Sequence, residues 1–158
     1  MSHIVIVYYS RTGKTRWAAQ KLAELLQADL EEIREAKSRG GVLGWLSAGK
    51  DAVMKRPAEI VSRHSTEGRS IVVLGMPVWA AGPPPAVRAY LAAADLAGRK
   101  VCAFCTSEGS GGEKCLQTVA AMVPAGLAER LHLAKVKPDK PGILAQIQQW
   151  VQKLQSLP

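Results

Sequence analysis

The chain has 158 residues, 47% of them hydrophobic and 22% charged, with a formal net charge of +8. This length and balance predict one folded domain over residues 1–158, and they exclude a disordered chain, a collagen and a coiled coil. No apolar run approaches the ~20 residues of a membrane span, and no basic region marks a secretory signal. Three cysteines cannot all form disulfides within the chain. We therefore expect a reduced cytoplasmic protein.

Strand and helix signals alternate along the chain. Continuous apolar runs at Ile4–Tyr9, Ile71–Leu74 and Val101–Cys105 predict strands that are buried on both faces. Weaker strands are predicted at Asp29–Ile33, whose acids favour a position near the sheet edge, and at Leu131–Val136. Five strands alternating with helices predict an α/β fold with a doubly wound, five-stranded parallel sheet of order 2-1-3-4-5. The helices are predicted from apolar residues at helical spacing in residues 18–26, 87–94, 116–123 and 143–154.

The segment from Ala36 to Glu59 differs from an ordinary connection between a strand and a helix. It contains four glycines around an apolar set that includes Trp45. It is too long for a simple crossover loop and too apolar for a free loop. We interpret residues 36–59 as the second crossover helix extended into a flap, and residues 42–54 as a surface through which a homodimer could form.

Three polar turns are predicted to follow the central strands. They are residues 10–15 (SRTGKT), residues 77–82 (PVWAAG) and residues 106–112 (TSEGSGG). In an open parallel sheet, ligands bind outside the carboxyl ends of the strands where the strand order reverses. That point lies between the first and third strands, so the sequence predicts that the three turns build one site.

The first of these turns has the composition of a phosphate site. Its three hydroxyls and the free N–H groups of a helix start can point at one phosphate, while its glycine permits close approach and its Arg and Lys add charge. A plain helix cap would need only one Ser or Thr. A triphosphate loop would need glycine where Tyr8 stands, which excludes that motif.

The other two turns have the composition of contacts to a flat ring. Trp79 stands among small residues between prolines, where its side chain can stack on a planar ligand, with core packing as the alternative. The small residues of 106–112 let backbone N–H and C=O groups reach the edge of a heterocycle. Together the three turns predict a site for a mononucleotide with a planar ring.

These motifs resemble those of the flavodoxin family. Ser10-x-Thr12-Gly13-x-Thr15 after a buried strand resembles the FMN phosphate loop of flavodoxins, [ST]-x-T-G-x-T. Residues 75–79 and 105–109 look like the two loops that flank the flavin ring, and residues 41–59 are similar to a segment of a bacterial flavodoxin subfamily. The resemblance covers nearly the whole chain and implies a flavodoxin-like α/β/α fold of three layers.

The resemblance also implies FMN as the cofactor and assigns its contacts by position. The phosphate would be bound by Ser10, Arg11, Thr12, Gly13, Lys14 and Thr15. One side of the flavin ring would be lined by Pro77, Val78, Trp79 and Ala80. The other side would be lined by Ser107, Glu108, Gly109 and Gly112. Because the flavin supplies the chemistry, no catalytic residue is expected.

The charge of the chain departs from the family pattern. Electron-carrier flavodoxins are typically acidic around the flavin, whereas the third turn here offers only Glu108. A less negative setting favours the anionic reduced flavin and raises its potential. The resemblance therefore implies an electron carrier or a small flavin oxidoreductase, with an acidic redox partner protein or an NAD(P)H reductase. The alternative is a flavin-free module of the same fold that binds an acidic partner.

The positive charge lies in two blocks. Residues 37–69 hold seven Lys or Arg against three acids, and residues 130–158 hold five against one. Neither block interleaves aromatic with basic residues, as a single-strand binder would, so nucleic acid is not expected as a partner.

The cysteines and histidines are interpreted as structural residues. Cys102 and Cys105 have the spacing of a redox motif, but residues three apart in a strand face opposite sides of a sheet. Cys115 is predicted to be buried in the following helix. No metal site is expected, since the histidines are scattered along the chain: His3, His64 and His132.

Overall fold

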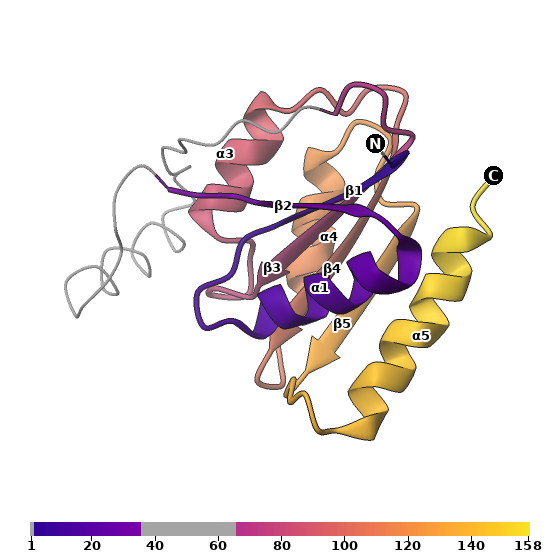
Figure 1. Cartoon of the computed structure of the whole chain (residues 1–158). Helices are drawn as coiled ribbons and strands as arrows, with labels where there is room; N and C mark the ends of the chain where they lie inside the picture. The colour runs from indigo at the N-terminus through magenta and orange to yellow at the C-terminus, as the bar shows by residue number, and fades with distance from the viewer. Residues whose placement is uncertain (1, 36–65) are drawn as a thin grey trace.

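Five parallel strands form the central layer of the protein (Figure 1). In the computed structural model, which describes residues 2–35 and 66–158, the strands lie in the order β2-β1-β3-β4-β5. The parallel pairing and this order confirm the predicted topology. The strands are β1 (Ile4–Tyr8), β2 (Asp29–Glu32), β3 (Ile71–Pro77), β4 (Lys100–Ser107) and β5 (Glu129–Ala134).

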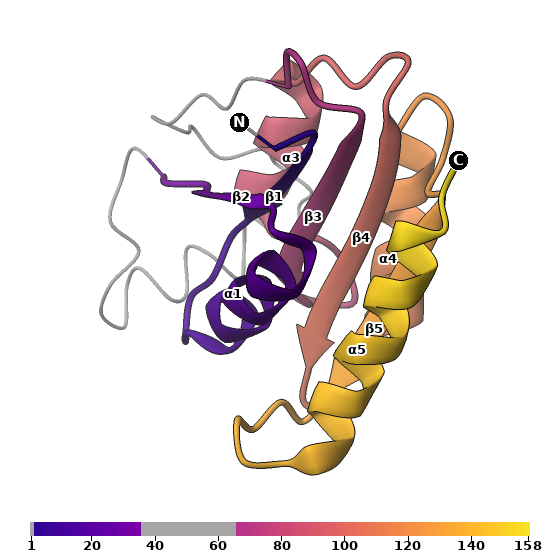
Figure 2. The same cartoon turned by 45° about the vertical axis from the view of Figure 1, so that its right-hand side comes forward.

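Helices cover both faces of the sheet, which gives the three predicted layers (Figures 1 and 2). Helices α1 (Lys14–Leu26) and α5 (Pro141–Gln155) pack on one face. Helices α3 (Pro85–Ala93) and α4 (Gly112–Met122) pack on the other. Within the described residues, no helix is long and apolar enough to cross a membrane.

The alternation of side chains along the strands builds two hydrophobic cores. In β1, Ile4 and Ile6 face α1 and α5, whereas Val5 and Val7 face α3 and α4. Both sets are buried, which is why the strand reads as a continuous apolar run. Trp150 of α5 packs edge to face on Phe104, with 6.2 Å between the ring centroids.

Strands β3 and β4 run further than their apolar runs predict, whereas β1 ends at Tyr8, one residue before its apolar run does. Strand β3 continues past Gly75 to Pro77, which pairs with Thr106 of β4. Gly75 pairs with Tyr8 of β1 and Phe104 of β4. The ring of Phe104 lies over it, so a Cβ at this position would come within 2.6 Å of Phe104 Cε1. The glycine therefore makes room for an aromatic ring of the neighbouring strand.

Strand β5 starts and ends two residues earlier than predicted. Its first residue, Glu129, pairs with Cys102 of β4, so the register of the ladder begins before the apolar residues do. Lys135 ends the strand, since its φ of 54° lies in the left-handed region. The predicted segment 36–59, with Trp45 and the contact surface at 42–54, lies outside the described residues.

The three cysteines are buried thiols on two sides of the sheet. Cys102 lies in the core under α1 and α5 and Cys105 in the core under α3 and α4, so the pair faces opposite ways, as predicted. Cys115 lies on the Cys105 side. Burial raises the pKa of Cys102 to about 11. A hydrogen bond with Cys115, together with burial, raises the pKa of Cys105 far above its usual range.

Candidate functional site

The three predicted turns meet at the carboxyl edge of the sheet. Lys14, at the start of α1, forms an ion pair with Glu108 of the β4–α4 turn. Gly111 lies against the β3–α3 turn, where a Cβ at position 111 would be 3.2 Å from Ala81 Cα. Arg11 places its guanidinium carbon 6.0 Å from the centroid of the Trp79 ring. Each turn thus contacts the other two, and the predicted convergence is found.

The β1–α1 turn presents backbone N–H groups at the start of α1. Gly13 precedes the helix with a φ of 96°, a left-handed conformation that favours glycine. The Ser10 hydroxyl accepts hydrogen bonds from the amides of Gly13, at 3.1 Å, and Arg16, at 3.2 Å. Ser10 therefore caps the helix from inside the turn. The amides of Lys14 and Thr15 have no acceptor among the described residues, so they can bind an anion.

The three hydroxyls of this turn differ in their hydrogen-bond partners, and this difference was not predicted from the sequence. Thr15 is 2% exposed, and its Oγ1 lies 2.8 Å from Thr106 Oγ1, so it joins α1 to β4. Ser10 is the internal cap. Thr12 is exposed and has no hydrogen-bond partner among the described residues. Thr12 is therefore the hydroxyl of the turn that is best placed for a ligand.

The β3–α3 turn is a tight hairpin that carries Trp79. The N–H of Trp79 donates to Gly82 O and the N–H of Gly82 to Trp79 O, both at 2.9 Å. Trp79 is half-buried and meets the ring of Tyr9 edge to face, at 5.6 Å between centroids. The tryptophan is thus partly packed on the core and partly exposed. This position combines the two interpretations made from the sequence, which were stacking on a ligand and packing in the core. Pro77 ends β3, Val78 is half-buried and Ala80 is exposed.

The hairpin is strained, because both of its central residues are alanines in the left-handed region. Ala80 has a φ of 50° and Ala81 a φ of 59°. This geometry is that of a type I′ turn, which favours Asn and Gly. An alanine costs about 1–2 kcal/mol in this region.

Replacing Ala81 with glycine is expected to raise the free energy of unfolding by about 0.5–1 kcal/mol, since glycine adopts this backbone without steric cost. Ala89→Gly, in the middle of α3, is the matched control and should lower the same free energy by about 1 kcal/mol. Urea denaturation measures both. Equal destabilisation by the two substitutions would contradict the strain at Ala81.

The β4–α4 turn is supported from below by a histidine that sequence reasoning missed. His132 Nε2 on β5 lies 2.5 Å from Ser107 Oγ, which also accepts the N–H of Gly109 at 3.2 Å. A Cβ at Gly112 would overlap the His132 ring, so glycine at 112 lets the ring pack against the start of α4. The pairing of β5 with β4 places His132 beside the end of β4. His132 could therefore have been found only if the register of β5 had been known.

Glu108 and Arg88 set the charge around the turns. The hydrogen bond from Lys14 is the main reason that the pKa of Glu108 is lowered. Arg88, on α3, is 8% exposed and lies beneath the hairpin, with its Nη2 near Gly82. Its Nη1 donates to Met122 Sδ at 3.9 Å, and no carboxylate among the described residues pairs with it. This buried charge could not be predicted from the sequence, because a lone Arg in a helix is normally solvated.

A family model described as Flavodoxin matches residues 3–154 of the chain. A search of the curated proteins found no match.

Several solved structures share the fold. A Bacteroides eggerthii protein assigned as a flavoprotein aligns with a TM-score of 0.81 at 23% identity, covering 98% of each chain. A Lactobacillus acidophilus flavoprotein in complex with FMN has a TM-score of 0.72 at 17% identity, over 93% of this chain and 97% of that one. The two-electron reduced flavodoxin of Megasphaera elsdenii has a TM-score of 0.54 at 20% identity, over 95% and 98%. At these identities the likeness establishes the fold alone.

Proposed function

Since the family model spans nearly its whole length, the chain belongs to the flavodoxin family, and we propose on that basis that it binds FMN and transfers electrons through it. The observation that carries the proposal is the convergence of the three turns on the open N-terminus of α1. FMN supplies the redox chemistry when it is bound. The chain binds the phosphate, positions the ring and sets the charge around it.

The phosphate fits the β1–α1 turn. The amides of Lys14 and Thr15 donate to the phosphate oxygens, and the positive end of the α1 dipole favours its negative charge. The exposed Thr12 hydroxyl adds a donor, and Gly13 leaves space, because no atom lies within 4 Å of its missing Cβ. In this proposal Ser10 and Thr15 hold the shape of the turn through Arg16 and Thr106.

In this proposal the other two turns line the flavin ring. Trp79 offers a half-buried ring on one side, held at a fixed angle by Tyr9. Ser107 ends β4 on the other side, and Glu108 and Gly109 follow it. Three cations, Arg11, Lys14 and Arg88, lie at or beneath these turns, and their charge favours the anionic form of the reduced flavin.

Titration with FMN, with riboflavin as the comparison ligand, tests the proposal. We expect one FMN per chain at micromolar or better Kd, and riboflavin at least about tenfold weaker, since it lacks the charged phosphate. Stepwise reduction of the complex then measures its potential and whether electrons enter singly or in pairs. Equal affinity for the two compounds would reject the phosphate assignment. A folded protein that binds neither would instead support the flavin-free module.

The electron donor is proposed to be a separate redox protein or an NAD(P)H-dependent reductase. The described residues form one three-layer unit and hold no second nucleotide-binding fold. NADPH added alone to the FMN complex is therefore expected to reduce the flavin slowly, and addition of a reductase to accelerate reduction. Rapid reduction by NADPH alone would identify the chain as a reductase in its own right.

Replacing Glu108 with glutamine is expected to strengthen FMN binding about two- to fivefold at low salt. The carboxylate holds Lys14 and carries a negative charge near the phosphate site, so its removal frees the cation and lessens repulsion. Glu24→Gln is the matched control, because Glu24 pairs with Lys21 on the outside of α1. Fluorescence titration at two salt concentrations measures the effect, and weaker binding by the Glu108 variant would contradict it.

A further inference from the structure

A band of positive side chains borders the three turns. We name this band the basic rim and define it by five residues: Arg11, Lys14, Lys135, Lys137 and Lys140. The last three lie in the β5–α5 turn, where they are exposed. The acids of the same turns are Glu108 and Asp139, so the rim has an excess of three positive charges.

The β5–α5 turn brings its lysines to the candidate flavin site. The N–H of Lys135 donates to Ser107 O at 2.7 Å, which continues the ladder to the end of β4, and the N–H of Lys140 donates to Lys137 O at 3.0 Å. Lys137 and Lys135 act with Lys14 to lower the pKa of Glu108, so their charges reach the mouth of the site. Figures 1 and 2 show this turn and the β4–α4 turn at the same end of the sheet.

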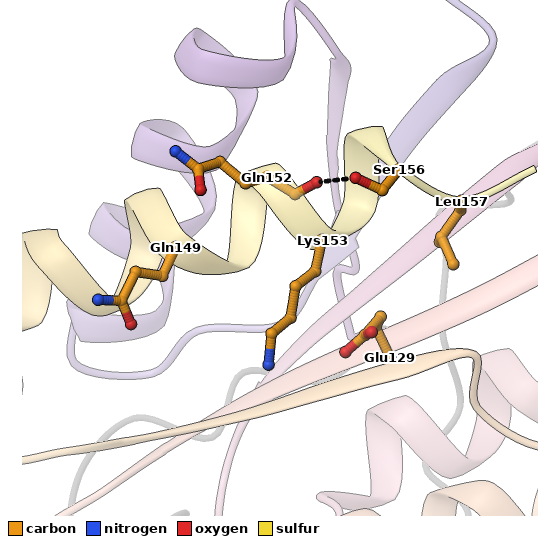
Figure 3. A pocket seen from close by; sticks show the side chains of 6 residues that line it. All are labelled: Glu129, Gln149, Gln152, Lys153, Ser156 and Leu157. Atoms are coloured by element: carbon orange, nitrogen blue, oxygen red, sulfur yellow. Dashed lines mark hydrogen bonds between the residues drawn. The ribbon is translucent and has the colours of Figure 1, made fainter.

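The hollow at the opposite end of the sheet differs from the basic rim in the charge of its side chains. An open hollow of about 530 Å³ lies between the start of β5 and the end of α5 (Figure 3). It has one acid and one base, Glu129 and Lys153, among neutral side chains. The lining of this hollow therefore has no excess of positive charge, and Lys153 is a control position of equal charge.

We propose that an acidic electron-transfer protein docks on the basic rim and exchanges electrons with the flavin there. This inference rests on the proposed function. The carboxylates of such a partner would face Lys135, Lys137 and Lys140, while the hairpin with Trp79 stays at the centre of the contact. Complementary charge steers two proteins into productive encounters and is weakened by salt. Small anionic donors and basic partners are the competing occupants.

Electron transfer to two haem proteins of opposite charge tests the docking surface. The FMN-loaded chain is reduced and mixed in a stopped-flow instrument with the acidic haem domain of cytochrome b5 or with basic cytochrome c. We expect the rate with cytochrome b5 to fall as salt is raised, and Lys137→Glu to lower it about three- to tenfold at low salt. The double variant Lys135→Glu/Lys137→Glu should lower it further, whereas Lys153→Glu should leave it nearly unchanged.

Direct binding separates failure of the docking proposal from failure of the proposed function. Calorimetry of the chain with oxidised cytochrome b5 reports docking whether or not FMN is present, and FMN titration of each variant reports the cofactor site. Equal losses in Lys137→Glu and Lys153→Glu, or a preference for cytochrome c, would overturn the docking proposal while leaving FMN binding intact. Absence of FMN binding with intact, Lys137-dependent docking would instead reject the proposed function alone.

Discussion

Replacing Gly75 with alanine is expected to lower the free energy of unfolding by about 3 kcal/mol. The added methyl group would come within 2.6 Å of Cε1 of Phe104, a fully buried residue of the adjoining strand. Phe104 is itself held by Trp150, so its ring cannot turn aside without disturbing the core under α5. Urea denaturation followed by circular dichroism measures the loss.

A second substitution identifies the cause of that loss. Phe104→Leu removes the ring that overlaps the new methyl group, so Gly75→Ala should cost much less in the Phe104→Leu background than in the native chain. Gly126→Ala is not a suitable control, because its φ of 72° adds strain of its own. Gly142→Ala is suitable, since no atom lies within 4 Å of its missing Cβ. Equal costs of Gly75→Ala in the two backgrounds would contradict the clash.

The second large effect is expected at the phosphate turn. Thr12→Ala should weaken FMN binding about ten- to a hundredfold, because it removes a hydrogen bond to a charged group. Its hydroxyl is exposed, so the free energy of unfolding should change by less than about 0.5 kcal/mol. Riboflavin affinity should stay the same, since riboflavin has no phosphate. Fluorescence titration with both compounds measures these effects.

Thr15→Val supplies the contrast to Thr12→Ala. The valine leaves Thr106 Oγ1 buried without its partner, so we expect the free energy of unfolding to fall by about 1–3 kcal/mol. Thr15→Val/Thr106→Val removes both hydroxyls and should recover part of this loss. FMN affinity that survives in a double variant lacking the hydroxyls of Thr12 and Thr15 would defeat the phosphate assignment.

The strand order could be predicted because each strand has its own local signal. The runs at residues 4–9, 71–74 and 101–105 are apolar on both faces, and parallel strands between helices leave few possible orders. The strand ends could not be predicted in this way. Gly75 has the composition of a turn, yet it pairs within the sheet with Tyr8 and Phe104, and the ring of Phe104 takes the space of its missing side chain. A contact between residues far apart in sequence leaves no local signal.

The same distinction applies to the candidate site. The three turns could be identified from their composition, and the structure brings them together. The division of labour among Ser10, Thr12 and Thr15 could not be identified, because it depends on Thr106 on β4. His132 and Arg88 were missed for the same reason, since their partners are Ser107 and the hairpin.

The burial of the three thiols affects how the protein resists oxidation in air. A reduced flavin that meets oxygen releases hydrogen peroxide, which attacks thiolates at accessible sites. Cys102 and Cys105 are protonated at neutral pH and enclosed on opposite sides of the sheet, and Cys115 is enclosed with Cys105. We therefore expect the folded protein to pass through repeated cycles of reduction and reoxidation by air without cysteine oxidation, and oxidised cysteine to accumulate only after unfolding.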